Sequence, residues 1–386
     1  MAPGRCCWRM QDCSDWVAVS RIRRIDRVCE EALMTSASSI MNHCLSEGFV
    51  AAGVADAVPS RHGEALTTWL DDGRHGEMGW LADHVEVRID PRVLVPNAQS
   101  VIVVADRYGG GPDGELPQGA GRIARYARGR DYHVHMKKRL HRIADVLSRE
   151  FPGETFRACV DTAPILEREV AAAAGLGAIG KHTLLIEPSV GSWLLLGEIV
   201  TTLAIEPTRM QDQIDPCGTC TRCIDACPTG AITPWSVDAT RCISYLTIEH
   251  RSDIDPEFHA GIGDWLFGCD ICQEVCPHNQ PTTLTSSAST HEAYEPRPAG
   301  RDETGASFDV REVLDWTEED RRKAFTTSSM KRAKLDMIRR NAVIVAGNYL
   351  KKQDDPSLRQ RLEAIAADPA ELQLVRQAAI DVIHPS

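Results

Sequence analysis

The sequence predicts an α+β protein of several domains, and three observations lead to this fold class. The chain has 386 residues, two to three times the usual length of one domain, so it can form more than one hydrophobic core. Between about residues 34 and 206, short β-branched runs alternate with amphipathic stretches of helical period. Eight of the 14 cysteines then fall within residues 217–276, where Cys, Pro and Gly replace these regular patterns. A mixed α/β domain therefore precedes a cysteine-rich one.

Composition excludes several classes of protein. With 43% hydrophobic and 25% charged residues, the chain is not of the disordered or fibrous type. Its apolar runs are much shorter than the ~20 residues of a membrane-spanning helix, so we expect no membrane partner. Residues 1–33 are charged throughout and lack the apolar core of a secretory signal, so we expect a disordered extension or a mis-assigned start before Met34. The cysteines then indicate metal or catalytic chemistry rather than disulfides.

The α/β domain, residues 34–206, is predicted from its elements in order. The β-branched run 100–105 predicts a buried strand, and 130–151 has the period of an amphipathic helix. Residues 156–160 predict another strand, followed by Pro164 at a helix first turn and by an alanine-rich helix. Residues 184–203 predict two strands joined by a turn.

Three further segments complete the predicted organisation. Residues 207–281 form the cysteine-rich domain, and the Thr-, Ser- and Pro-rich residues 282–304 form a linker. Residues 305–386 hold four stretches of helical period, each too short to bury its apolar face alone. We therefore expect stacked helix pairs of the solenoid kind in this last domain.

The cysteines carry the most specific signal in the chain. The segment 217–228 has the spacing C-x2-C-x2-C-x3-C-P of bacterial ferredoxins, in which the fourth cysteine ligates the other of two [4Fe-4S] clusters. Zinc is the alternative, but zinc sites pair two C-x2-C units across a spacer. A second run at 269–276 lacks the first cysteine of its triplet, and Cys242 is available to replace it. The prediction is one cluster on Cys217, Cys220, Cys223 and Cys276, and another on Cys227, Cys242, Cys269 and Cys272.

The sequence has no nucleotide-binding motif that would indicate a second redox cofactor. The string GLGAIG at 175–180 matches G-x-G-x-x-G, but it follows a predicted helix instead of a strand, so the dinucleotide interpretation fails. The sequence also has no P-loop. Two clusters side by side pass single electrons, so the reaction centre that receives them must be of another kind.

At this point the residues resemble the tRNA epoxyqueuosine reductase family, which depends on cobalamin and iron-sulfur clusters. The resemblance covers nearly everything from Met34 onward, through GEMGWLADHVEVRIDP, VDTAPILEREVAAAAGLGAIGKHT, both cysteine runs with RCISYLTIE between them, and RRNAVIVAGN. It departs at Ala178, where the family often has Trp, and in residues 1–33, which have no counterpart. The resemblance implies a cytoplasmic oxidoreductase, a monomer, that removes the epoxide oxygen of epoxyqueuosine at the wobble position of tRNA anticodons, the last step of queuosine biosynthesis.

The resemblance also implies cofactors and site residues. It implies a base-off cobalamin held between an α/β cobalamin-binding domain and the ferredoxin-like domain, C-terminal HEAT-like repeats that bind tRNA, and an unidentified electron donor. Asp161 matches the general acid of the motif V-D-[ST]-A-P. A proton donor must be held protonated by burial against an apolar surface. From the residues alone, a cap on the following helix is the favoured role of Asp161. The positions that match cobalamin contacts are Arg88, Arg168, Lys181 and Ser244.

Charge distribution bears on the tRNA partner. The net charge of −12 argues against nucleic acid, yet residues 321–352 hold ten Lys or Arg against Asp336 alone. Such a stripe is typical of phosphate binding, although a solvated helix face is the alternative. Two other functions remain open, a corrinoid reductase of the reductive-dehalogenase kind and a ferredoxin-like electron carrier. The predicted tRNA contacts are Lys331, Arg332, Arg339 and Arg340.

Overall fold

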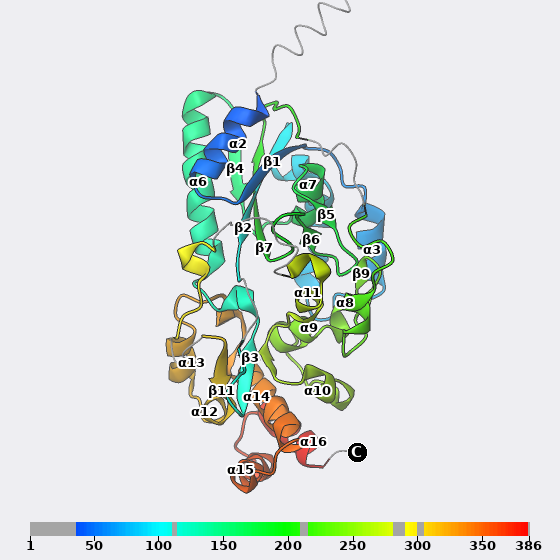
Figure 1. Cartoon of the computed structure of the whole chain (residues 1–386), viewed down its shortest axis with the longest axis vertical. Helices are drawn as coiled ribbons and strands as arrows, with labels where there is room; N and C mark the ends of the chain where they lie inside the picture. Colours follow the sequence, from blue (N-terminus) through cyan, green and yellow to red (C-terminus); the bar gives the residue numbers. More distant parts are fainter. Residues whose placement is uncertain (1–35, 110–113, 209–214, 281–289, 299–304, 385–386) are drawn as a thin grey trace, which may run out of the picture.

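The computed structural model describes residues 36–109, 114–208, 215–280, 290–298 and 305–384 (Figure 1). The predicted extension 1–33 and most of the predicted linker 282–304 lie outside these residues. None of the described helices combines the length and the apolar character that crossing a membrane requires.

The N-terminal half is built on a four-stranded sheet. Its order is β1 (Ala51–Asp56), β2 (Ser100–Arg107), β7 (Leu194–Thr201) and β4 (Phe156–Cys159). The strands predicted at 100–105 and 156–160 are therefore present as β2 and β4. The three strand pairings in this sheet, β1 with β2, β2 with β7 and β7 with β4, are all antiparallel. The domain is consequently α+β, and a doubly wound parallel sheet is excluded.

Helices cover both faces of this sheet. Helices α2 (Ala37–Ser46) and α6 (Tyr132–Glu150) share one core with Ile102 and Val104 of β2. Helix α7 (Glu167–Ala173) shares the other core with Val101 and Val103. Alternation along β2 thus sends neighbouring side chains to opposite helical layers, and both layers are visible beside the sheet in Figure 1. Burial on both faces explains why β2 is apolar without alternating polar residues.

Short elements fill the connections of this half and the cysteine-rich region. Between β1 and β2 lie α3 (Gly63–Asp71), η1 (Gly79–Leu81), α4 (Val85–Ile89) and α5 (Pro91–Leu94). After α7 come the paired strands β5 (Ala178–Ile179) and β6 (Leu185–Ile186). The cysteine-rich region holds α8 (Arg222–Asp225), β8 (Ile232–Thr233), β9 (Ser236–Val237), η3 (Ala239–Arg241), α9 (Ile243–Ile248), α10 (Pro256–Ile262), β10 (Trp265–Phe267), α11 (Ile271–Glu274) and η4 (Pro277–Asn279).

A second sheet joins segments that the sequence places in three different domains. Strand β3 (Ala120–Ile123) lies between β10, which runs parallel to it, and β11 (Ser307–Asp309), which runs antiparallel. Part of the predicted linker is also packed: η5 (Glu292–Tyr294) buries Tyr294, whose hydroxyl donates to Asp106 Oδ2 at 2.7 Å. The predicted domains are contiguous segments of the chain, whereas β3, β10 and β11 come from three of these segments and form one sheet.

The C-terminal helices surround one central helix. The elements are α12 (Val310–Leu314), α13 (Glu318–Ala324), η6 (Ser329–Arg332), α14 (Leu335–Leu350), α15 (Pro356–Ala367) and α16 (Gln373–Ile383), while the short η2 (Arg125–Ala127) follows β3 in the N-terminal half. Helix α14 packs against α10, α12, α16 and β10, and 11 of its 16 residues are buried. The predicted helices are present, and their arrangement as HEAT-like repeats stays a prediction.

Candidate functional site

The eight cysteines of residues 217–276 lie in one region of short helices and loops, and among the described residues no three His, Cys, Asp or Glu side chains are arranged so that they could hold a metal ion. Cys276 belongs to the second run in sequence, but the thiols that act electrostatically on it, after burial, are Cys217, Cys223 and Cys220 of the first run. In the same way, Cys227 acts electrostatically on Cys242, and Cys272 and Cys242 act on Cys269. Cys272 also has Cys223 within electrostatic range, so the two predicted sets adjoin. Most of these electrostatic neighbours fall within the two sets of four that the spacing predicts, and the assignment of the ligands to two clusters stays a prediction.

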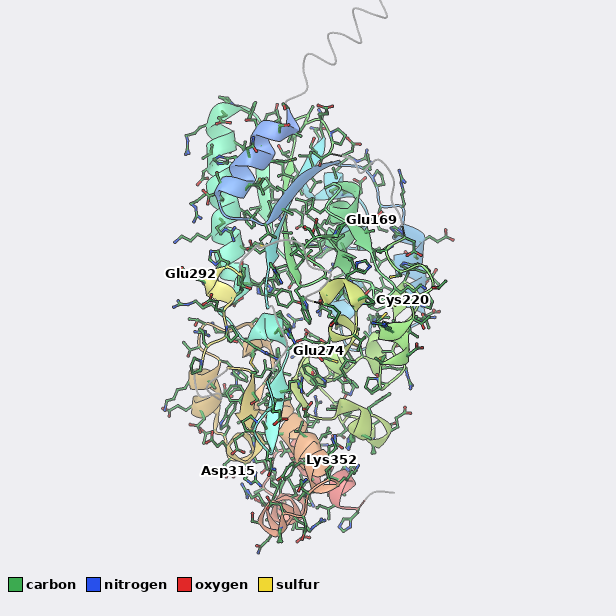
Figure 2. All side chains as sticks on the ribbon, viewed as in Figure 1. Glu169, Cys220, Glu274, Glu292, Asp315 and Lys352 are labelled. Atoms are coloured by element: carbon green, nitrogen blue, oxygen red, sulfur yellow. The ribbon has the colours of Figure 1, made fainter. Side chains whose placement is uncertain are left out.

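The surroundings of these thiols suit iron-sulfur ligation. Burial raises the pKa of Cys269, Cys272 and Cys276, so without metal these thiols hold their protons. Main-chain amides already point at sulfur: Ala231 N–H donates to Cys227 Sγ at 3.3 Å. Such amides stabilise thiolates and tune the potential of a cluster. Figure 2 places Cys220 and Glu274, from the two cysteine runs, midway between the four-stranded sheet and the C-terminal helices.

Lys181 supports the first cysteine run and does not reach a cofactor cavity. Its main-chain N–H donates to Cys217 Sγ at 3.3 Å, and its ammonium donates to the carbonyls of Gly218 at 2.7 Å and Cys220 at 3.0 Å. The side chain is buried. The predicted cobalamin contact at Lys181 is therefore replaced by a structural role, because its donors are used to close the loop that carries three of the cysteines.

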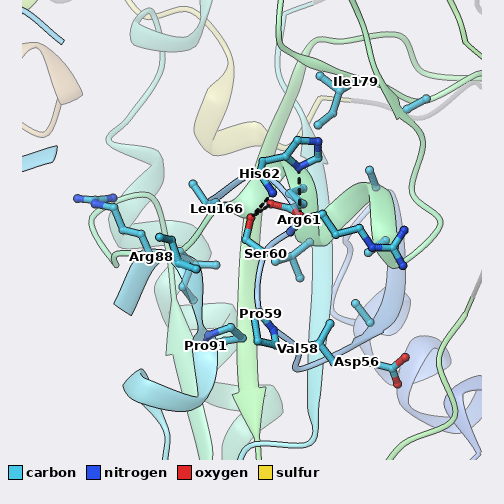
Figure 3. Close-up of a pocket in the computed structure, with 18 of the residues that line it drawn as sticks. Asp56, Val58, Pro59, Ser60, Arg61, His62, Arg88, Pro91, Leu166 and Ile179 are labelled. Carbon is cyan, nitrogen blue, oxygen red and sulfur yellow. Dashed lines mark hydrogen bonds and ion pairs between the residues drawn. The ribbon is translucent and has the colours of Figure 1, made fainter. Parts of the chain in front are cut away.

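A cavity of about 560 Å³ lies beside this region, between the loop after β1, helices α4, α5 and α7, and residues 215–216 (Figure 3). One wall is apolar, with Val87, Ile89 and Leu166. On another side Glu169 accepts hydrogen bonds from Ser60 Oγ at 2.5 Å and from the main-chain N–H of Arg61 at 2.9 Å. The cavity thus combines an apolar surface with a fixed polar edge, as sites for organic cofactors do.

Of the four predicted cobalamin contacts, Arg88 lines this cavity. Its Nε is buried and has no hydrogen-bond partner among the described residues, so it is a donor free for a ligand. Arg168 instead donates to the carbonyl of Thr183 at 2.7 Å, and Ser244 lies on α9, outside the cavity lining. The structure therefore brings Arg88 to the cavity and leaves Arg168, Lys181 and Ser244 outside its lining.

Asp161 lies in the loop between β4 and α7. Its φ of +40° is in the left-handed region that residues with side chains rarely adopt, a strain found mainly where a site requires it. The capping alternative is wrong, because the N-cap of α7 is Leu166 and no side chain caps this helix. Instead, Asp161 Oδ2 lies 2.9 Å from His133 Nε2. The loop therefore holds the carboxylate toward α6.

His133 links two carboxylates and carries the proton. Its Nδ1 lies 2.8 Å from Asp131 Oδ1, and Asp131 also caps α6. Burial lowers the pKa of His133, but hydrogen bonds and charge from Asp131 and Asp161 outweigh burial and raise it to about 9. Burial raises the pKa of Asp161, yet the bond to His133 and its charge bring it below the ordinary value. The pKa of Asp161 therefore lies below its ordinary value here, and its protonation by burial against an apolar surface stays a prediction.

Two tyrosines complete this cluster. The ring of Tyr132 stacks on His133 with centroids 4.0 Å apart, and its hydroxyl hydrogen-bonds to Asp161. Tyr126 meets Tyr132 edge to face at 6.3 Å. Burial, and then the charge of Asp161, raise the pKa of both phenols, so both stay neutral. Sequence reasoning missed His133 and Tyr132; the signal was the run 131–133 at the start of a helix.

The predicted tRNA contacts separate into two groups. Lys331 and Arg332 are exposed and approach the cluster, Lys331 near Asp131 and Arg332 near Asp161. Arg339 is mostly buried and pairs with Glu371 at 2.7 Å. Arg340 is completely buried and donates to the carbonyls of His250, Ser252 and Leu246. Arg340 is therefore corrected from a phosphate contact to a structural residue, because its position on α14 faces the core.

Trp80 is a further residue that sequence reasoning did not find. Its side chain is 44% exposed. The guanidinium of Arg88 lies 5.5 Å from its ring centroid and that of Arg332 lies 5.4 Å away. One exposed indole therefore connects the cavity, which Arg88 lines, to the region of Asp161.

Comparison with known proteins finds related sequences for both parts of the chain. Residues 216–279 match the model of a 4Fe-4S double cluster binding domain, and residues 88–162 match "Epoxyqueuosine reductase QueG, DUF1730". An epoxyqueuosine reductase of Synechococcus sp. (strain RCC307) is 40% identical over 311 residues, which are 79% of this chain and 92% of the relative.

Two solved structures have the same fold. An epoxyqueuosine reductase with an epoxyqueuosine-modified tRNA-Tyr stem loop superposes with a TM-score of 0.77 at 27% identity, covering 90% of this chain and 88% of that one. An epoxyqueuosine reductase of Bacillus subtilis, described with its catalytic aspartate loop swung out of the active site, gives a TM-score of 0.76 at 26% identity, covering 90% and 89%.

Proposed function

The chain belongs to the epoxyqueuosine reductase family and is an oxidoreductase, and we propose that it reduces epoxyqueuosine to queuosine at the wobble position of tRNA anticodons with cobalamin and two [4Fe-4S] clusters. The observation that carries the proposal is the cluster of Asp161, His133 and Tyr132 beside a double-cluster domain. The reduction of an epoxide requires both protons and electrons, and these two parts of the chain would supply them.

We propose that the clusters use the two sets of four cysteines described above. Cys276 would complete the set of the first run, and Cys227 and Cys242 the set of the second. Electrostatic proximity of the thiols within each set supports this division. Because the sets adjoin at Cys272 and Cys223, electrons from a donor outside the chain would pass between them.

The residues around the cavity fit a corrinoid. Arg88 offers an unpaired buried donor, and the apolar wall suits one side of a large ring system whose edges carry amides. A cavity of about 560 Å³ would hold one part of a cofactor as large as cobalamin. When bound, cobalamin supplies a low-valent cobalt that reduces the epoxide. Arg88 and the cavity wall would position the group next to Trp80.

The protons come from this chain's own residues. Converting an epoxide to an alkene consumes two electrons and two protons and releases water. His133 Nε2 holds a proton against Asp161 Oδ2, and a pKa of about 9 keeps that proton in place near neutral pH. Asp161 would pass the proton to the epoxide oxygen, with Tyr132 stabilising its negative charge between transfers.

The tRNA would be held by the exposed basic residues close to this cluster. Lys331 and Arg332 are placed to contact phosphates of an anticodon stem loop whose modified base reaches Asp161. The exposed ring of Trp80 lies on the same side. We also propose a cytoplasmic monomer that receives its electrons from another protein.

The test is a single turnover with an epoxyqueuosine-containing stem loop. Protein reconstituted anaerobically with iron, sulfide and cobalamin, then reduced chemically, should convert the modified base to queuosine, as measured by mass spectrometry of the digested RNA. Its absorption should show a corrinoid as well as iron-sulfur bands. Iron-sulfur bands without bound corrinoid and without conversion would favour an electron carrier.

A further inference from the structure

The cavity described above does not include the cluster around Asp161. Its lining contains Ile165 and Leu166 but none of Asp161, His133 and Tyr132. In the proposed function, protons and electrons meet at the epoxide next to Asp161, so the reacting metal of cobalamin lies there and not in the cavity. This inference rests on the proposed function and concerns which part of the cofactor the cavity takes.

The size and the apolar lining of the cavity match a nucleotide-sized group. Its volume of about 560 Å³ is in the range of pockets that hold drug-sized ligands. The tail of cobalamin, a benzimidazole joined to ribose and phosphate, is a group of this size, whereas the corrin ring with its amides is much larger. The aliphatic side chains in the lining, Ile165, Val170 and Ile179 among them, suit an aromatic base. In a base-off corrinoid this base has left the cobalt and needs a site of its own.

Trp235 lines this cavity from the tip of the hairpin of β8 and β9. Thr233 pairs with Ser236, so Pro234 and Trp235 form a two-residue connection. Trp235 has a φ of +59°, in the left-handed region that turns usually give to Gly or Asn. Strain of this kind is found mainly at ligand sites, where the surrounding structure maintains it. A large aromatic side chain therefore stands where the turn itself favours glycine.

The indole of Trp235 is held in place while much of it stays uncovered. Its Nε1–H donates to the carbonyl of Ile179 at 3.3 Å, and its main-chain N–H donates to the carbonyl of Lys181 at 3.1 Å. The ammonium of Lys181 lies 5.6 Å from the ring centroid. Trp235 is nevertheless 51% exposed. Because these contacts already order the ring, a ligand can pack on it with little further loss of side-chain entropy.

The polar groups of the cavity leave one buried donor for an anion. Asp215 accepts hydrogen bonds from the main-chain N–H groups of Cys217 at 2.8 Å and Gly218 at 3.1 Å. Glu169 is bound to the loop of residues 60–62. Arg88 Nε is buried and has no hydrogen-bond partner among the described residues. These two carboxylates are thus used in anchoring loops, and the guanidinium of Arg88 is available to a phosphate.

We propose that the cavity receives the benzimidazole nucleotide of cobalamin, with the base packed on the ring of Trp235 and Arg88 donating to the phosphate. The base then lies beside Lys181, whose ammonium closes the loop of the first cysteine run. The cavity is therefore specific for the tail, and the corrin ring lies outside it toward Asp161.

The test compares cobalamin with cobinamide, which has the same corrin ring and no nucleotide. The full chain, reconstituted anaerobically with iron and sulfide, is titrated with each corrinoid, and binding is followed by absorption. Trp235→Gly removes the ring while placing at φ +59° the residue that adopts this conformation without strain, so the turn is kept. Trp235→Phe keeps an aromatic ring, and Leu372→Ala is the control, an exposed apolar residue outside the cavity lining.

We expect Trp235→Gly to bind cobalamin roughly 5- to 150-fold more weakly than the parent, the range for loss of base stacking on an aromatic side chain. Its affinity for cobinamide and its iron content should stay parental. Trp235→Phe should retain most of the affinity for cobalamin, and Leu372→Ala should match the parent with both corrinoids.

Three results would overturn the proposal while leaving the proposed function intact. The first is an unchanged affinity of Trp235→Gly for cobalamin. The second is an equal loss for cobalamin and cobinamide, which would place the corrin ring against Trp235. The third is a loss of iron along with both corrinoids, which would assign Trp235 to the support of Lys181 and the cysteine loop. A parent that binds neither corrinoid would refute the use of cobalamin in the proposed function, and this inference with it.

Discussion

His133 Nε2 lies 2.9 Å from Asp161 Oδ2 while its Nδ1 lies 2.8 Å from Asp131 Oδ1, so one imidazole bridges two carboxylates. Both ring nitrogens therefore donate, and the ring is charged near neutral pH. In the proposed mechanism, the imidazolium of His133 supplies the proton that Asp161 passes on. The predictions below begin with these residues.

Replacing Asp161 with Asn should remove the carboxylate through which the proton of His133 would pass, while keeping the size of the side chain. Because a positioned general acid contributes roughly 10²–10⁴-fold to rate, we expect single-turnover product formation to fall by at least ~100-fold. Iron content, corrinoid binding and tRNA affinity should stay parental, as absorption and filter binding would show. Product formation at the parental rate would show that Asp161 is not the general acid, and Tyr132 and His133 would then be the candidates.

Stability should depend on pH through His133. Its pKa is raised from 6.5 to about 9 in the folded chain, so its charged form stabilises the fold fully below about pH 6.5. That stabilisation is lost as pH rises through about 9. We expect the parent to exceed His133→Asn in free energy of unfolding at pH 6, with the difference shrinking toward pH 9.5. Denaturant titrations at matched cluster content measure this, and a difference that grows with pH would contradict the bridge.

Metal analysis should give eight iron and eight labile sulfide per chain, from two sets of four cysteines. Cys276→Ala should spoil the cluster of Cys217, Cys220 and Cys223 and leave the other intact, as resolved by electron paramagnetic resonance. Cys44→Ala is the control, because this buried thiol lies in the core under α2. Loss of the cluster anchored by Cys269 would reverse the assignment of the two sets.

Charge reversal at Lys331 and Arg332 should weaken tRNA binding. Each lost phosphate contact removes about 0.7–0.9 from the slope of log affinity against log salt. Lys351→Glu with Lys352→Glu is the control, since Figure 2 places Lys352 near the C-terminal helices, far from the cysteine runs. Equal salt slopes for the two double variants would show that proximity to Asp161 has no bearing on binding.

Arg340→Ala should unfold the protein's C-terminal half rather than alter recognition of tRNA. The guanidinium donates to the buried carbonyl of Leu246 and to the partly buried carbonyls of His250 and Ser252, and leaving a buried carbonyl unpaired costs about 1–3 kcal/mol. Thermal unfolding would show the loss, whereas the exposed Arg359→Ala should behave as the parent. A stable Arg340→Ala variant with weakened tRNA binding would show instead that Arg340 contacts tRNA phosphate.

Much of the local structure could be predicted from the sequence because it depends on local patterns. The β-branched run of β2, the period of α6 and the cysteine spacing each require only neighbouring residues. The antiparallel sheet was not predicted, because strand direction depends on connections that periodicity does not encode.

Only part of the candidate site was predicted, because its residues come together from segments that are distant in sequence. Asp161 was found through a family motif, while His133 pairs with it from a helix 28 residues earlier. Arg339 and Arg340 were grouped with Lys331 and Arg332 by charge alone. A run of charges in sequence does not reveal which positions of a helix face the core. On α14 most positions face the core.

The three-stranded sheet bears on the order of events at the ribosome. Its middle strand, β3, ends at Ile123, but its partners are completed only at Phe267 and Asp309. Until residue 309 has left the exit tunnel, β3 lacks one of its two neighbouring strands. The sheet that contains β10, which directly precedes the second cysteine run, is then incomplete. Nascent chains should therefore acquire iron only near the end of synthesis. Chains truncated before β11 should be poor acceptors of clusters, although they contain every cysteine ligand.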